Sequence, residues 1–207
     1  MSFVMRKILR GFLVGLFLLF AWPWFLYKKY GNVKYRPDGK TIIAANHYSN
    51  FDAFFIYLMY GRKKIYFAAI DGSKTRCVPR FITWLFDCVF VETEGYNYKF
   101  IRKCIDILNR GGIICIFPEG VINPRKFGFF DFKNSFVYFA KKTGAKILPV
   151  YVYPELNPFK RSKLYIGDVI PAEEIADKSA DGASIYVQCK IAEYSNLLEQ
   201  IKNKSPK

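Results

Sequence analysis

At 207 residues the chain is long enough for one sizeable hydrophobic core and hardly long enough for two, so we expect a single domain. Its five cysteines are odd in number and form no C-x-x-C pair, which argues against a disulfide framework and a thiolate metal site. The formal net charge of +15 predicts an anionic partner, and either nucleic acid or an anionic membrane would fit that charge.

The first predicted element is an apolar segment at the N-terminus, residues 1–30, which we interpret as a membrane anchor. An uncharged run from Gly11 to Tyr27 lies between basic residues. As a helix this run would span roughly 25 Å, slightly less than the roughly 30 Å of a bilayer core, and Pro23 disfavours a straight crossing. We therefore expect a kinked, in-plane or re-entrant anchor. A signal peptide and a soluble core helix are the alternatives, but no small-residue cleavage site ends the run.

The rest of the chain, residues 31–207, forms the predicted catalytic domain, in which strands alternate with helices from about residue 40. Short apolar runs typical of buried strands occupy 41–46, 64–70, 112–117, 146–153 and 162–170. Apolar residues recur at helical spacing in 52–60, 98–110, 131–144 and 184–201. This alternation predicts an α/β fold, a single domain whose mixed, largely parallel sheet is flanked by helices.

The only histidine, His47, directly follows the first predicted strand, and Asp52 lies at the start of the next helix. Catalytic residues in α/β folds gather at the carboxyl ends of strands. One tight turn could bring the Asp52 carboxylate to one ring nitrogen of His47, which would fix the tautomer and leave the other nitrogen free to accept a proton. The pair would then act as a general base. The alternative is a polar turn whose two side chains only satisfy backbone groups.

Further motifs follow this turn in a fixed order. IICIFPEG (113–120) places Pro-Glu-Gly at the end of another predicted strand, and DFKNSFVYFAKKTGAKILPVYV (131–152) comes after it. The sequence NHYSNFD, then FPEG, then a helix that begins with FK, then a strand containing LPV resembles the glycerolipid acyltransferases typified by 1-acylglycerol-3-phosphate acyltransferase. The resemblance covers about residues 40–176, and the combination of motifs is far more specific than any one of them.

The resemblance implies transfer of a fatty acyl group from acyl-CoA or acyl carrier protein to a lysolipid hydroxyl, in the first place that of 1-acylglycerol-3-phosphate. His47 would deprotonate the hydroxyl and Asp52 would orient the ring, with no metal, no other cofactor and no covalent acyl-enzyme. Glu119 and Gly120 are expected at the substrate, although Glu119 could instead brace the site. Backbone N–H groups near His47 or Gly120 are candidates for stabilising the oxyanion. We expect a membrane-associated enzyme whose active site faces the cytoplasm.

Two positions depart from the family pattern. Thr93 occupies the position of the arginine in the family's Phe-x-x-Arg motif. Ile122 occupies the position of the arginine in the Thr-Arg pair that follows FPEG in the family. Both arginines are associated in that family with the phosphate of the acceptor. Either other cations rebuild the phosphate clamp, or the acceptor is a lysolipid without a bare phosphate. The candidate cations, which could also form an ordinary solvated or lipid-facing surface, are Arg76, Arg80, Arg125, Lys126 and Lys133.

Two alternative functions and one alternative mechanism are to be compared with this interpretation. A non-catalytic peripheral membrane protein could use the same anchor and basic surface to bind anionic lipid. Nucleic-acid binding fits the charge and the 19% of aromatic residues, but aromatic runs such as 52–60 are typical of buried helix faces, and we expect no nucleic-acid partner. A covalent cysteine mechanism is disfavoured, because Cys104 and Cys115 occupy positions typical of a core.

Overall fold

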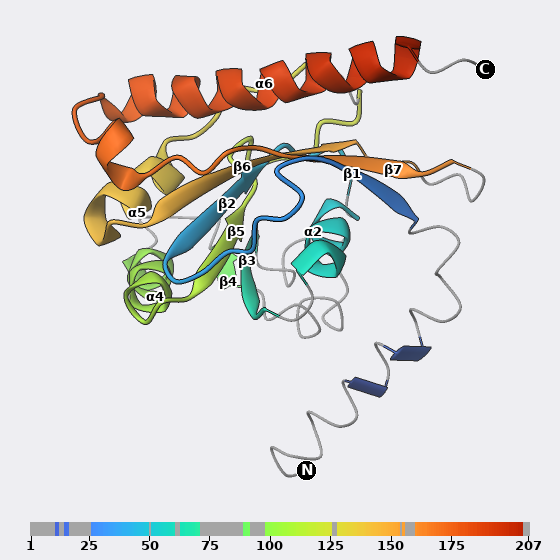
Figure 1. The fold of residues 1–207 in the computed structure, drawn as a ribbon. Helices are drawn as coiled ribbons and strands as arrows, with labels where there is room; N and C mark the ends of the chain where they lie inside the picture. Colours follow the sequence, from blue (N-terminus) through green and yellow to red (C-terminus); the bar gives the residue numbers. More distant parts are fainter. Residues whose placement is uncertain are drawn as a thin grey trace.

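The structure is a computed structural model, and its described part is a single α/β domain (Figure 1). The described residues are 11–12, 15–16, 26–49, 51–60, 63–70, 89–91, 98–125, 128–153, 155 and 160–204. The elements in chain order are β1 (Tyr27–Gly31), β2 (Thr41–Ala45), α2 (Asp52–Tyr60), β3 (Ile65–Ile70), β4 (Val89–Val91), α4 (Tyr98–Asn109), β5 (Ile113–Ile116), α5 (Ser135–Thr143), β6 (Lys146–Tyr153), β7 (Ser162–Ile166), the 3-10 helix η2 (Ala172–Ile175) and α6 (Ala180–Lys204).

The sheet has seven strands in the order β1-β7-β6-β2-β5-β3-β4. Neighbouring strands from β6 to β4 are parallel, whereas β7 is antiparallel to β6 and β1 is parallel to β7. The predicted mixed, largely parallel sheet is therefore confirmed. Because β2, β5 and β3 run in the same direction, the loops that follow them meet at one edge of the sheet.

Alternating residues of the central strands build one core on each face of the sheet. In β2, Ile42 and Ala44 belong to the core that α4, α5 and α6 cover, while Ile43 and Ala45 face the core beneath α2 (Figure 1). All four side chains are fully buried. Burial on both faces explains why these strands are near-continuous apolar runs in the sequence.

Several boundaries differ from those predicted. Tyr27 pairs with Ser162, so the sheet begins inside the segment that we assigned to the anchor. Strand β4 and helix η2 were not predicted at all, because each is too short to show a hydrophobic period. Helix α5 begins only at Ser135, so Lys133 precedes the helix and does not lie in its first turn.

The membrane anchor stays a prediction, because most of residues 1–25 lie outside the described residues. Two pieces of that run are described, and in them the side chains of Phe12 and Leu16 are exposed. Among the described residues we find no helix whose length and apolar content would carry it through a bilayer.

Candidate active site

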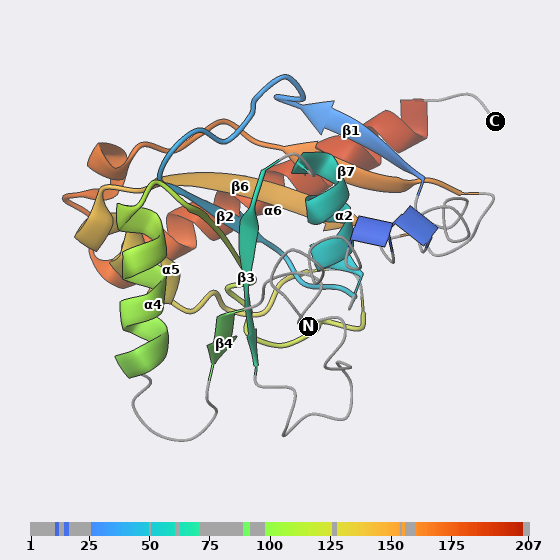
Figure 2. The ribbon, with the colours of Figure 1, turned by 90° about the horizontal axis from the view of Figure 1, so that it is seen from below.

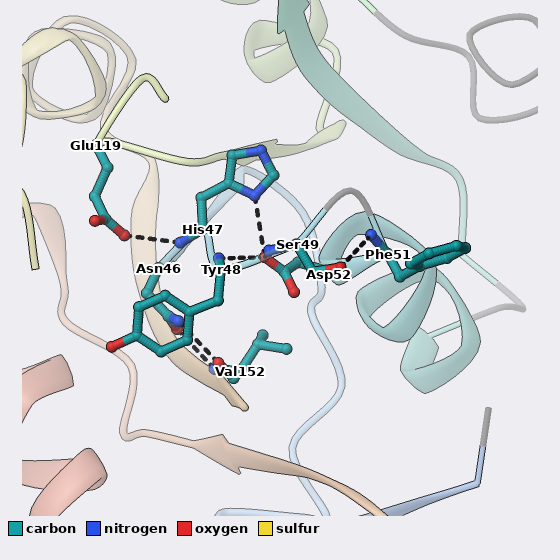
Figure 3. A network of polar contacts seen from close by, with 8 residues as sticks. All are labelled: Asn46, His47, Tyr48, Ser49, Phe51, Asp52, Glu119 and Val152. Atoms are coloured by element: carbon teal, nitrogen blue, oxygen red, sulfur yellow. Dashed lines mark hydrogen bonds and ion pairs between the residues drawn. The ribbon is translucent and has the colours of Figure 1, made fainter. Parts of the chain in front are cut away.

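The turn that follows β2 brings His47 and Asp52 together (Figure 3). Nδ1 of His47 lies 3.0 Å from Oδ2 of Asp52. The Asp52 side chain is completely buried, whereas 19% of the His47 side chain is exposed. A carboxylate on Nδ1 favours the tautomer that carries its proton there, which leaves the lone pair on Nε2, on the side of the ring away from Asp52.

The same Asp52 oxygen organises the backbone of the turn. Oδ2 accepts the N–H groups of Tyr48 at 2.6 Å and Ser49 at 2.8 Å. Burial raises the pKa of the Asp52 carboxyl, and His47 together with these two N–H donors opposes that shift. The hydroxyl of Ser49 accepts the N–H of Phe51 just before α2. The turn is therefore folded around the carboxylate that orients the histidine.

Asn46 anchors this turn to the sheet, a role that the sequence analysis missed. Its side-chain amide donates to the carbonyl of Val152 at 2.8 Å, and its side-chain oxygen accepts the N–H of Val152 at 2.7 Å. These two bonds continue the pairing of β2 with β6 beyond Ala45, while the backbone already turns away. An asparagine at the end of an apolar strand was the signal in the sequence that could have identified it, because an amide that is buried there needs hydrogen-bond partners.

Phe117, at the end of β5, is a second residue whose role was missed. Its ring stacks on the imidazole of His47, with centroids 4.2 Å apart and planes inclined by 16°. The ring belongs to the core beneath α2 and is only partly exposed. One face of the imidazole is therefore covered, which restricts the ring to the plane in which it meets Asp52.

Glu119 connects the histidine turn to the loop before α5. Oε1 accepts the N–H of His47 at 2.8 Å, and Oε2 accepts the N–H of Phe130 at 2.9 Å. The side chain is only 3% exposed. Burial raises the pKa of this carboxyl, and the two N–H donors oppose the rise. This geometry favours the bracing role for Glu119 over binding of a substrate hydroxyl, and the brace uses backbone groups.

Four of the backbone N–H groups near His47 and Gly120, the region in which we expected the oxyanion donors, already have acceptors. The N–H of His47 donates to Glu119, and the N–H of Gly120 donates to the carbonyl of Phe117 at 3.0 Å. Those of Tyr48 and Ser49 donate to Asp52. None of the four has a hydrogen to spare for a developing oxyanion, because each N–H has only one.

The loop after Gly120 is tied to the histidine turn. The N–H of Asn123 donates to the carbonyl of His47 at 2.6 Å, and the hydroxyl of Tyr48 donates to the carbonyl of Gly128 at 2.8 Å. Asn123 and Tyr48 are both buried. Their bonds hold the loop that carries Arg125 next to the turn that carries His47.

Lys133, one of the two predicted cations that the structure describes, lies against the FPEG turn. Gly120 has a φ of +72°, and a Cβ added there would lie 2.7 Å from Nζ of Lys133. Glycine is therefore required both by its backbone conformation and by the close approach of the lysine. Arg125 is exposed in the loop beyond, and Ile122 is partly exposed.

Four residues that the sequence motifs singled out cannot be placed in this site. Arg76, Arg80 and Thr93 lie outside the described residues, as does Lys126. Their predicted connection with a phosphate of the acceptor stays a prediction.

Cys104 and Cys115 lie in the core and not at a nucleophilic site. Cys104 and Cys115 are fully buried in the two cores, as predicted. Burial raises the pKa of Cys104 to about 12, so this residue stays a thiol at neutral pH. The described residues contain no cluster of three or more His, Cys, Asp and Glu side chains that could hold a metal ion.

Comparison with known proteins gives matches of three kinds. A family model described as "Acyltransferase" matches residues 27–153. A Mycoplasma pneumoniae protein described as a probable 1-acyl-sn-glycerol-3-phosphate acyltransferase is 24% identical over 135 residues, which are 61% of this chain and 49% of that protein. The chain thus spans about half the length of this curated relative.

The third match is a crystal structure. The 1-acyl-sn-glycerophosphate (LPA) acyltransferase of Thermotoga maritima has a TM-score of 0.67 and 21% sequence identity with this chain. The match covers 98% of this chain and 85% of that one, which shows that the two proteins share a fold.

Proposed function

Because the chain belongs to the acyltransferase family, we propose that it transfers a fatty acyl group from a thioester to the hydroxyl of a lysolipid, with His47 as the general base. The observation that carries this proposal is the contact between Nδ1 of His47 and the buried carboxylate of Asp52, which leaves Nε2 on the opposite side of the ring (Figure 3). The family match includes both residues.

In the proposed reaction, Nε2 of His47 removes the proton of the acceptor hydroxyl as its oxygen attacks the thioester carbonyl. The new C–O bond forms, the C–S bond breaks, and the proton passes from the imidazolium to the leaving thiolate. The carboxylate of Asp52 keeps Nδ1 oriented and stabilises the positive charge that the ring carries in between. The thioester is acyl-CoA or acyl carrier protein, and neither a covalent acyl-enzyme nor a bound metal enters the mechanism.

The proposed acceptor is 1-acylglycerol-3-phosphate, and the product is phosphatidic acid. Lys133 supports this proposal, because its ammonium lies against Gly120, in the turn that Glu119 holds next to His47. Arg125 is exposed in the loop that is fastened to the histidine turn, so this loop carries a second cation on the same side of the sheet as His47. A phosphate monoester with nearly two negative charges is bound well by such a lysine and arginine. The names of both relatives contain the same substrate, 1-acylglycerol-3-phosphate.

A lysolipid without a bare phosphate is the second candidate, and the sequence itself favours it at two positions. Thr93 and Ile122 replace the arginines that the resemblance associates with the phosphate of the acceptor. Neither side chain carries a charge, so the usual clamp is lost at both positions. In this case the reaction and the roles of His47 and Asp52 are unchanged.

The acceptor is tested by supplying the purified full chain with acyl-CoA and a set of lysolipids, while release of free thiol is followed. A preference for lysophosphatidic acid that is lost in Lys133→Ala or Arg125→Ala supports the rebuilt clamp. Lys190→Ala is the matched control, because this lysine lies on α6 and pairs with Glu193. Equal or faster turnover of acceptors without a bare phosphate by the wild-type protein contradicts the clamp and assigns the second candidate.

A further inference from the structure

A basic pocket of about 540 Å³ lies at the edge of the sheet opposite to His47. Its walls come from the loop that enters β2, from the start of β3, and from the turn between α4 and β5. Figure 2 shows α4 ending beside the loop that leads into β2. The side chains that matter for the argument are those of Lys63, Lys64, Tyr66, Lys103, Asp106 and Arg110.

The pocket is separate from the candidate active site. Strand β5 begins at the pocket with Ile113, and it ends next to Phe117, whose ring lies on His47. At about 3.3 Å per residue, the length of β5 alone separates the two places by roughly 13 Å. A small ligand in the pocket therefore does not touch the imidazole.

The charge of the pocket is strongly unbalanced. Four cationic side chains (Lys63, Lys64, Lys103 and Arg110) line it together with a single carboxylate, that of Asp106. Within the described part of the chain, neither Lys103 nor Arg110 forms an ion pair. Like charges gathered around a concave surface raise its potential, and an anion relieves that repulsion.

Stabilisation of the α4 dipole does not account for these cations. The last carbonyls of α4 already accept backbone N–H groups. Arg110 donates to the carbonyl of Asp106, Gly112 to that of Ile107, and Gly111 to that of Leu108. Lys63 and Lys64 come from a different segment, the approach to β3. Lys64 is held over the ring of Tyr66, with Nζ 4.8 Å from the centroid, which keeps its charge at the pocket wall.

The side chains also indicate the chemical class of the ligand. The planar guanidinium of Arg110 together with lysine ammonium groups suits the oxygens of a phosphate better than the single negative charge of a carboxylate. The carboxylate of Asp106 repels an anion, but it can accept a hydrogen bond from a hydroxyl group of the ligand. The volume is within the range of small-molecule sites, roughly 300 to 1,000 Å³.

We propose that this pocket binds a phosphate ester that carries a free hydroxyl group, either a soluble molecule or the headgroup of a lipid. The site does not depend on the proposed acyl transfer, and its ligand is not the acceptor at His47. Arg110 and the lysines hold the phosphate, while Asp106 accepts a hydrogen bond from the hydroxyl.

The test measures binding to the full chain with two probes. Glycerol 3-phosphate, followed by calorimetry, represents the soluble ligand, and phosphatidylcholine vesicles with and without phosphatidylinositol represent the headgroup. Arg110→Ala should weaken binding of one or both probes by about tenfold or more, since it removes a charge-assisted contact. The arm in which binding is lost identifies the source of the ligand.

Two further variants make the test specific. Arg102→Ala removes a cation from the same helix but not from the pocket, and it should change binding by less than about twofold, as expected for a screened surface charge. Asp106→Ala removes the hydroxyl acceptor and a negative charge together, so it should strengthen binding of inorganic phosphate and reduce the preference for glycerol 3-phosphate over inorganic phosphate. The proposal is overturned if Arg110→Ala changes the binding of neither probe, or if Arg102→Ala weakens binding as much as Arg110→Ala does.

Discussion

The rings of His47 and Phe117 lie face to face, with centroids 4.2 Å apart and an interplanar angle of 16°. The two residues follow neighbouring parallel strands, β2 and β5, so the sheet itself sets their separation. Phe117 covers one face of the imidazole while Asp52 holds Nδ1. The base is therefore fixed in both plane and rotation before any substrate binds.

Replacing Phe117 should thus slow the reaction without abolishing it. Phe117→Leu keeps apolar bulk but removes the flat surface, so the imidazole gains rotational freedom, and we expect kcat to fall by about tenfold. KM should change little, because the ring lies on the base. Initial rates over a range of acceptor concentrations measure both constants. Phe100→Leu, in α4 at a distance from the site, controls for the stability cost of losing a phenyl ring. An unchanged kcat in Phe117→Leu contradicts the positioning role.

Asp52→Asn separates orientation of the base from folding of the turn. Oδ1 of Asp52 has no hydrogen-bond partner among the described residues, so an amide nitrogen at that position loses no bond, and the amide oxygen can still accept from Tyr48 and Ser49. The thermal midpoint should therefore stay close to that of the wild type. The rate should fall by about 10²- to 10⁴-fold, because the imidazolium loses its counter-charge. A large loss of stability together with a normal rate per folded molecule contradicts this assignment.

Glu119→Ala tests whether this residue braces the site or binds the acceptor. The change leaves two part-buried N–H groups, those of His47 and Phe130, without their acceptors. Each unsatisfied group costs about 1 to 3 kcal/mol when buried, so the free energy of unfolding should fall by about 2 to 6 kcal/mol. Denaturant titration measures the loss. Glu119→Gln keeps one good acceptor and should lose less. Normal stability with a raised KM for the acceptor indicates substrate binding instead.

Membrane association should reside in the residues that precede β1. We expect removal of residues 1–25 to weaken binding to vesicles and to leave activity on a short-chain, monomeric acceptor, because the sheet begins only at Tyr27. Removal of residues 1–30 is a different experiment, since it also takes most of β1 and its pairing with β7. Sedimentation with vesicles at low and high salt separates apolar from electrostatic attachment. Complete release of the full chain by salt contradicts an apolar anchor.

The sequence was sufficient for most of the strands and helices and for the central contact of the site. Apolar runs and helical spacing identified the elements, and the position of His47 after a buried strand predicted its contact with Asp52, which the structure confirms. These features depend on residues that are close together in the sequence, so a local sequence pattern is enough to predict them.

Contacts between distant segments were beyond the reach of that analysis. The bonds of Asn46 to Val152 and the contact of Phe117 with His47 depend on which strands are neighbours in the sheet. The order of the strands in the sheet cannot be inferred from the sequence of any one strand. The same limit applies to the basic pocket, whose cations come from segments far apart in the chain.

The most direct test of the proposed mechanism is the rate of acyl transfer by His47→Ala. The purified variant and the wild type are compared with acyl-CoA and lysophosphatidic acid, at equal concentrations of folded protein verified by circular dichroism and thermal midpoint. Our account predicts a folded protein whose rate has fallen by about 10³-fold or more, because the variant loses the only histidine of the sequence and with it the proposed general base. A folded His47→Ala protein that retains a rate near that of the wild type contradicts the account.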